Sequence, residues 1–422
     1  MKNSSRHIWE QPWSYREGIL IAAGIGLSGL ILQLFLGNIH PTLFAAPLNL
    51  IIGALFMTGL LAVYLLARKR PLGRWLTSVA ATLPALALFL LLSIFLGVIP
   101  QFPSGSETAL PDNLFTSLGW YRMTTSWPFV LICFYLLLIL GLTTLRRTTR
   151  KQEWRDIGFY LNHLGLFIAL LGGVLGSADM ERLTMRVQEG QVEWRGTTAT
   201  GALKELPLAI QLDSFLLEEY PPKLVVIEHE SGRMLPTERP ESYMFEGVGK
   251  TTDLAGYTVE ILEYLPHAAI FSDDSITRVV PMLMEGATAA LRVKVTPEGG
   301  AAPKEGWVSN GSYLYPHSLL RIDETRSLAM PLQEVKRYTS HVTLYTEEGH
   351  TRKSLIEVNH PVMMEEWMIY QYSYDDTMGK YSDTSVFELV RDPWLKVVYT
   401  GIFMLLAGAL FLFFAGPKKS RT

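Results

Sequence analysis

The fold of the chain is decided by the stretch IGFYLNHLGLFIALLGGVLGSA, which runs from Ile157 to Ala178. This stretch contains no Asp, Glu, Lys or Arg, and a helix needs about 20 mostly apolar residues to span a lipid bilayer. From Asp179 to Trp394 the composition changes, because charged residues are then spread throughout the chain. The stretch is therefore predicted to be a membrane-spanning helix that leads directly into a large water-soluble domain.

Five further apolar segments have the length of a membrane span, at about 18–37, 46–67, 75–99, 127–145 and 395–415. Lys396 is the only charged residue in these five segments. Tryptophans, whose indole rings favour the interface between lipid and water, stand at or near segment ends: Trp13, Trp75, Trp127, Trp154 and Trp394. The chain is 49% hydrophobic and 18% charged, which is too apolar for an ordinary soluble enzyme of 422 residues. We therefore expect an α-helical membrane bundle of six transmembrane helices.

The basic residues of the short connections predict the orientation of the chain. Fifteen of them belong to one side of the membrane: Lys2, Arg6, Arg16, Arg68, Lys69, Arg70, Arg74, Arg146, Arg147, Arg150, Lys151, Arg155, Lys418, Lys419 and Arg421. The short connections of the opposite side carry only Arg122. Because cytoplasmic loops are enriched in Lys and Arg, both termini are predicted to be cytoplasmic and the domain at 179–394 to lie outside.

The domain between the fifth and sixth spans shows the pattern of β-strands. Short alternating or apolar runs rich in β-branched and aromatic residues are separated by Gly-containing or charged turns. The clearest runs are KLVVIE at 223–228, YTVEIL at 257–262, ALRVKV at 290–295, HVTLYT at 341–346 and WMIYQYSY at 367–374. We expect a large β-rich extracytoplasmic domain, mostly antiparallel, built as a sandwich or a barrel.

Several function classes find no support in the sequence. The net charge of −3 gives no basic surface for nucleic acid, and a single cysteine, Cys133, excludes a disulfide within the chain. Within the domain at 179–394 a Gly-rich phosphate loop, HExxH, GxSxG and paired metal-ligand spacing are absent, and CxxCH does not occur in the chain. The outer domain is therefore predicted to be a binding or docking module that folds without metal or disulfide.

Seven short segments, taken in order along the chain, resemble those of the ResB (CcsB) proteins of system II cytochrome c maturation. They are GVIPQ at 97–101, SWPF at 126–129, LNHLG at 161–165, GSAD at 176–179, VNHP at 358–361, WMIYQ at 367–371 and VRDP at 390–393. The resemblance extends from Leu72 to Ala415. His360 is a departure, because the family pattern has a lysine at this position of its Val-Asn-x-Pro motif.

The resemblance divides the chain into four parts. Residues 1–71 are expected to form an N-terminal two-helix membrane extension that precedes the four spans of the family. Residues 72–178 form a ResB-like membrane core of three helices, and residues 179–394 form the extracytoplasmic β-rich domain. Residues 395–422 form the C-terminal transmembrane helix and a cytoplasmic tail.

The resemblance also implies a function, as one half of a haem exporter and cytochrome c synthetase. The sequence lacks the tryptophan-rich haem-handling motif and the flanking histidines of the family's partner, so a CcsA (ResC)-like membrane partner is expected. Together the two would deliver haem b across the bacterial cytoplasmic (inner) membrane and present it to the CxxCH cysteines of an apocytochrome c. Alone, this chain is expected to be a non-catalytic or co-catalytic subunit.

His163 is the candidate haem ligand, because it is the only histidine within a predicted span. Ionisable groups inside a membrane are functional candidates, and neutral imidazole is a good axial ligand for haem iron. The alternative is a structural histidine that is hydrogen-bonded across helices, through Asn162 or a backbone carbonyl. The resemblance favours haem taken up near the inner face, with the partner supplying the other ligand. The propionates of this haem would pair with nearby arginines: Arg146, Arg147, Arg150 and Arg155.

Two other features have simpler structural explanations. Gly172 and Gly176 form a GxxxG pattern, which favours close packing of helices. His40 precedes Pro41 at the outer end of the first span and is predicted to serve as a cap or to lie at the interface, rather than to bind haem.

A function from a different class stays open beside haem delivery. The chain could be a membrane-anchored extracytoplasmic binding or sensing protein that handles no haem. A substrate transporter is disfavoured, because the spans lack charged residues and evident inverted repeats.

The predicted orientation can be tested with reporter fusions in the short connections and in the large domain. A fusion at Thr149 should report the cytoplasm and one at Gly190 the outer side. The reason is that the connections with the fifteen basic residues, which include Thr149, are predicted to stay in the cytoplasm. A cytoplasmic signal from Gly190 would overturn the predicted topology.

Overall fold

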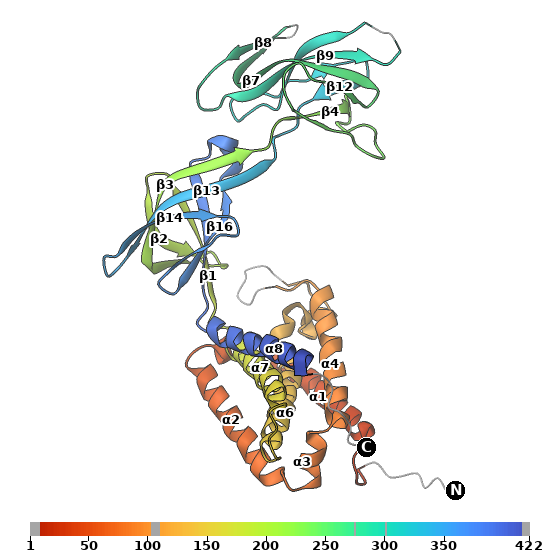
Figure 1. The fold of residues 1–422 in the computed structure, drawn as a ribbon, viewed down its shortest axis with the longest axis vertical. Helices are drawn as coiled ribbons and strands as arrows, with labels where there is room; N and C mark the ends of the chain where they lie inside the picture. The colour runs from red at the N-terminus through yellow and green to blue at the C-terminus, as the bar shows by residue number, and fades with distance from the viewer. Residues whose placement is uncertain (1–8, 103–109, 274–275, 300–301, 416–422) are drawn as a thin grey trace. The chain divides into compact units, whose positions relative to one another are not determined.

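The structure is a computed structural model that describes residues 9–102, 110–273, 276–299 and 302–415. The chain divides into two compact units. The helical unit comprises Met1–Arg182, Ala199–Ala202 and Val390–Thr422, and the β-rich unit comprises Leu183–Thr198 and Leu203–Leu389. Figure 1 shows the helices of the first unit and the strands of the second.

Among the described residues, the helical unit contains six helices that are long and apolar enough to cross a membrane. They are α1 (Tyr15–Leu36), α2 (Leu48–Ala67), α4 (Val79–Val98), α6 (Trp127–Thr148), α7 (Asp156–Leu175) and α8 (Leu395–Ala415). Shorter turns connect them: η1 (Pro41–Phe44), α3 (Pro71–Leu76), α5 (Leu114–Ser117) and η2 (Trp120–Thr125). The six predicted spans are confirmed as helices, and the β-rich unit falls between the fifth and the sixth.

Glycines allow these helices to approach one another closely. A Cβ atom at Gly165 of α7 would lie 2.7 Å from the carbonyl oxygen of Gly401 in α8, and one at Gly29 of α1 would lie 2.6 Å from the Cα of Pro128 in α6. In the predicted GxxxG pattern, Gly172 lies against Val397 of α8 and Gly176 lies against Trp394, the residue before α8. The prediction of close packing is therefore confirmed, as expected where van der Waals contact between small residues drives association in lipid.

The two N-terminal helices are an integral part of the bundle. α1 packs against α4 and α6, and α2 packs against α6 and α7. α1 begins at a capping box in which the Ser14 side chain and the Glu17 carboxylate bond each other's backbone N–H groups. At its other end the buried amide of Gln33 donates to Asn38 at 3.0 Å and accepts from the Trp127 N–H at 3.2 Å.

Within the described residues the β-rich unit contains three sheets. The ladders that join β14, β13, β3, β2 and β1, the β15–β16 ladder and the ladders of the two smaller sheets are antiparallel. The eight-stranded sheet has the order β14-β13-β3-β2-β1-β17-β16-β15. Its strands are β1 (Glu181–Gln188), β2 (Val192–Thr197), β3 (Leu203–Glu219), β13 (Val335–Thr346), β14 (Thr351–Glu357), β15 (Val362–Met364), β16 (Trp367–Tyr374) and β17 (Thr384–Arg391). The prediction of a mostly antiparallel β-rich domain is confirmed.

The two smaller sheets hold the remaining strands. The five-stranded sheet consists of β6 (Thr251–Leu254), β7 (Tyr257–Asp273), β8 (Ile276–Pro281), β9 (Thr288–Pro297) and β10 (Lys304–Ser309). The four-stranded sheet consists of β4 (Lys223–Glu228), β5 (Tyr243–Met244), β11 (Leu320–Arg321) and β12 (Arg326–Ala329). A 3-10 turn, η3 (Asp376–Tyr381), lies between β16 and β17.

Two separate hydrophobic cores stabilise the β-rich unit. Alternation along β1 turns Leu183, Met185 and Val187 inward, where they join Phe387 in the core of the eight-stranded sheet. The second core contains side chains of the two smaller sheets, among them Leu291. The division into two cores was not predicted, because strand alternation shows which side chains are buried but not which strands share a core.

The eight-stranded sheet closes on itself. Its two edge strands, β14 and β15, follow each other in the chain, and an antiparallel bridge joins Glu357 to His360 across the turn between them. β14 also contacts β16. The turn is the segment 358–361, in which Asn359 has a φ of 65°.

Truncation of the first core should strongly destabilise the β-rich unit. Phe387 is fully buried, so Phe387→Ala should lower the free energy of unfolding by about 3–5 kcal/mol. Leu216 in β3 is 55% exposed, and Leu216→Ala is the control that should cost less than about 1 kcal/mol. Pulse proteolysis of the full chain in detergent, over a urea series, measures both. Equal losses in the two variants would contradict the assigned core.

Candidate functional site

His163 lies half-buried on α7, directly after Asn162, which packs against α8. Its Nδ1 lies 3.0 Å from the carbonyl oxygen of Phe159, and its ring stacks on the Phe159 ring with centroids 3.8 Å apart. A carbonyl oxygen can only accept, so Nδ1 carries the proton and donates it. The lone pair of the neutral ring is then on Nε2, which is the arrangement that a metal-ligating histidine needs.

Arg147 extends this arrangement toward the predicted cytoplasmic end of the helix. Its guanidinium carbon lies 5.5 Å from the centroid of the Phe159 ring. It also forms an ion pair with Asp156, whose carboxylate accepts the Arg147 Nε–H at 3.0 Å and the Glu153 backbone N–H at 2.9 Å. Carboxylate, guanidinium, phenyl ring and imidazole thus form a continuous series of contacts, which we call the His163 column: Asp156, Arg147, Phe159 and His163.

The other three predicted propionate partners lie apart from the His163 column. Arg146 donates to the Arg74 carbonyl oxygen at 3.2 Å and to the Thr77 hydroxyl group. The Arg155 guanidinium lies over its neighbour Trp154, at 5.5 Å from the ring centroid. Arg150 is exposed just after the end of α6. Among the four arginines, the described contacts connect only Arg147 to the candidate ligand.

The hydrogen bond of His163 does not join two helices. It runs within α7, from position 163 to the carbonyl of position 159. Asn162, the partner considered for a structural histidine, donates instead to the Gly158 carbonyl at 2.8 Å and lies against Gly408 of α8. Of the two partners considered for a structural histidine, the backbone carbonyl is the one observed. The hydrogen bond, however, joins two residues of the same helix.

A second polar centre lies at Asp179. It connects the two segments of the helical unit that come before and after the β-rich unit in the sequence. Asp179 accepts hydrogen bonds from the Trp394 indole at 2.7 Å, the Ala46 backbone at 2.7 Å and the buried Asn49 amide at 2.5 Å. A cavity of about 640 Å³ lies beside these residues and is also lined by Arg391. The segments GSAD and VRDP and the N-terminal extension therefore meet at Asp179.

Two predicted features of single residues can be placed directly. His40 accepts the Thr42 backbone N–H at its Nδ1, 3.4 Å away, and so caps η1 as predicted. His360 is exposed in the turn that closes the eight-stranded sheet.

The β-rich unit contains a polar cavity of about 400 Å³ that was not predicted from the sequence. Glu219 and Lys380 line it, and within the described residues neither side chain forms an ion pair. Burial raises the pKa of the Glu219 carboxyl and lowers the pKa of the Lys380 amine. The Tyr381 hydroxyl, which donates to the Ala287 carbonyl at 3.0 Å, fixes one wall. The lining comes from several distant segments, and the only local signal is the polar and aromatic run at 374–381.

A comparison with known families finds a match within the β-rich unit. The model of the ResB-like family matches residues 317–384. This segment of the chain is ResB-like. It runs from just before β11 to the start of β17 and contains two of the seven resembling segments, VNHP and WMIYQ, as well as the Lys380 wall of the polar cavity. The predicted resemblance to the ResB family is thus confirmed. No curated protein matches the chain.

Loss of the Asp179 carboxylate should destabilise the helical unit. Asp179→Ala should lower its stability by about 1–3 kcal/mol, because the Asn49 amide and the Trp394 indole lose their acceptor. Asp112, which is exposed in the connection before α6, provides the matched control Asp112→Ala. Thermal unfolding in detergent, followed by Trp fluorescence, compares the two. A melting temperature of Asp179→Ala equal to that of wild type would show that these bonds contribute nothing.

Proposed function

We propose that this chain is the ResB-type subunit of a system II cytochrome c maturation complex, taking part in haem delivery across the bacterial cytoplasmic membrane. The observation that carries the proposal is the ResB-like match at 317–384, in a chain with six membrane-length helices and a β-rich unit between the last two. The basic connections orient both termini toward the cytoplasm and the β-rich unit toward the outside.

Haem is the substrate in this proposal, and His163 is its axial ligand on the inner half of the membrane. The Nδ1–H bond to Phe159 supports this role, since it leaves Nε2 free and holds the ring in one orientation. A second support is Arg147, a cation that lies over the Phe159 ring, which in turn stacks on His163. Arg147 is the propionate partner that the geometry favours, with Arg146, Arg150 and Arg155 available at the same end of the bundle.

The chemistry of haem attachment needs a partner. A CcsA (ResC)-like protein would supply the second axial ligand, and an apocytochrome c would supply the CxxCH thiols that add to the haem vinyl groups. This chain contributes no catalytic residue; it binds, orients and shields the substrate. The polar cavity, which Glu219 and Lys380 line, offers the β-rich unit a place to contact a polypeptide.

A membrane-anchored binding protein without haem is the second candidate. The polar cavity of about 400 Å³ favours it, because the cavity lies in the β-rich unit and requires nothing of the membrane helices. Under this candidate the His163 column would only stabilise the end of α7.

Replacement of His163 distinguishes the two functions. If His163 ligates haem, His163→Ala should remove most of the Soret absorbance of the purified complex while protein abundance stays nearly unchanged. Added imidazole can enter the vacated axial position and should restore part of the absorbance. The matched control is His40→Ala, which removes the η1 cap and should leave the haem content at the wild-type value.

A purely structural His163 gives a different result. Loss of a hydrogen bond inside a membrane protein costs about 0.6 kcal/mol on average, so the variant would be slightly less stable. Its haem content per protein would equal that of wild type, and imidazole would have no effect. That result would retire His163 as a ligand.

A further inference from the structure

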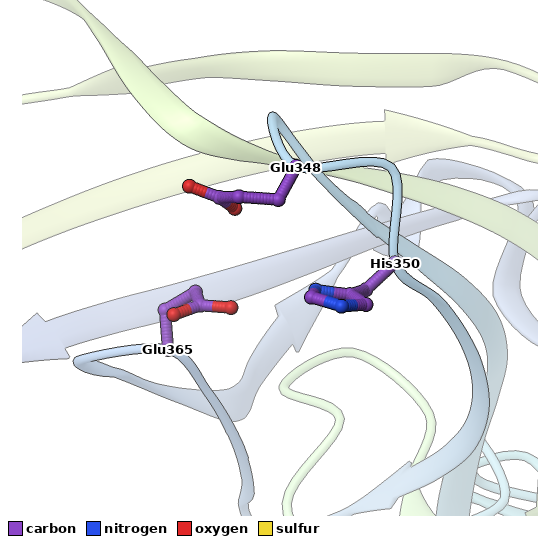
Figure 2. Close-up of side chains that lie close together, drawn as sticks. All are labelled: Glu348, His350 and Glu365. Carbon is purple, nitrogen blue, oxygen red and sulfur yellow. The ribbon is translucent and has the colours of Figure 1, made fainter.

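The geometry points to a divalent-metal site in the β-rich unit, formed by Glu348, His350 and Glu365, with zinc as the ion that fits best. One ligand atom from each of the three residues lies within 4.8 Å of the others. Figure 2 shows the two carboxylates and the imidazole turned toward a common space. The site is independent of the proposed haem function.

The three residues come from two turns that the fold brings together. Glu348 and His350 belong to the turn between β13 and β14, where the Thr346 N–H donates to the His350 carbonyl at 3.0 Å. Glu365 belongs to the turn between β15 and β16. Because β14 and β15 are the two edges of the closed eight-stranded sheet, residues at the far ends of these strands become neighbours. The Arg352 guanidinium, which donates to the Met363 carbonyl at 3.3 Å, joins the same two strands.

The chemistry of the three side chains is that of a metal site rather than of an acidic patch. All three side chains are exposed, and within the described residues none of them forms a hydrogen bond or an ion pair. Two carboxylates that face each other without a cation repel, and a shared cation removes that repulsion. The imidazole adds a nitrogen donor, and a set of nitrogen with carboxylate oxygen suits zinc, whereas calcium and magnesium prefer oxygen alone.

The spacing requires only a small closure of the side chains. Ligand atoms bound at zinc distances of 2.0–2.2 Å around a tetrahedral ion lie about 3.4 Å apart. The observed separation of up to 4.8 Å therefore needs about 1 Å of movement, which rotation of exposed glutamate side chains provides. Three protein ligands leave the fourth position to water.

A metal at this position would hold together the two edges of the eight-stranded sheet. The turn 358–361 joins these edges at one end, and the metal would join them at the other. The chain contains one cysteine and so has no disulfide for this purpose. The hydrophobic core around Phe387 lets the sheet fold without metal. A bound metal would make opening of the β14–β15 hairpin less favourable.

Zinc titration of the full chain tests the site. Tag-free protein in detergent, treated with chelator and dialysed, is titrated with Zn²⁺ in a calorimeter. Wild type should bind one Zn²⁺ that His350→Ala weakens by at least about tenfold, since even the loss of an outer-shell partner costs that much. Glu348→Gln and Glu365→Gln should each weaken binding as well, and millimolar Ca²⁺ should not compete.

Two neighbouring residues provide matched controls, and a second measurement reports on the hairpin. His360→Ala and Glu347→Gln remove exposed groups from the turns on either side of β14 and should bind Zn²⁺ as wild type does. Hydrogen exchange at residues 351–364 should become slower with Zn²⁺ in wild type and stay unchanged in His350→Ala. Absence of Zn²⁺ binding by wild type at micromolar concentration, or equal affinity in wild type and His350→Ala, would overturn the site.

Discussion

The close contact between α7 and α8 is the constraint on which the rest of the structure depends. These helices are separated in sequence by more than 200 residues, yet at Gly165 and Gly401 their backbones touch with no room for a Cβ atom. In a membrane, helices gain little from hydrophobic burial against each other, so small residues and a few polar bonds must hold them. The Asp179–Trp394 bond adds such a polar tie at the end of the pair. An entire β-rich unit can therefore be inserted between two helices that remain packed.

This pairing also determines what His163 can do. Positions 158, 162, 165 and 172 of α7 lie against α8, so the packing face is occupied by glycines and Asn162. His163 is one residue further around the helix and its bond stays within its own turn. An imidazole held in this way is fixed in tautomer and in direction without being consumed by a helix–helix contact. That combination is what the proposed role of His163 as a haem ligand requires.

The sequence predicted the elements well because each depends on a local pattern. Spans follow from about 20 apolar residues, and strands such as 223–228 and 367–374 follow from β-branched and aromatic runs, so both strands appear with the predicted bounds. The roles of the four arginines could not be separated in this way. Arg146 and Arg147 are adjacent in sequence, but the packing of α6 on α7 gives them different partners. Arg147 lies over the Phe159 ring, whereas Arg146 donates to Thr77. The division into two cores and the closure of the eight-stranded sheet depend likewise on long-range pairing, which periodicity does not record.

The same reasoning explains why the polar cavity and the Glu348–His350–Glu365 cluster are absent from the sequence pattern. Metal-binding motifs are recognisable when ligands share one helix or one loop, whereas here two turns meet because a sheet closes.

Spectra of the wild-type chain, purified with a CcsA-like partner from haem-replete cells, test directly whether the chain handles haem. Optical and electron paramagnetic resonance spectra are both recorded. A chain that handles haem should give near-stoichiometric low-spin haem with nitrogen ligation. A colourless complex that still supports cytochrome c assembly would contradict it.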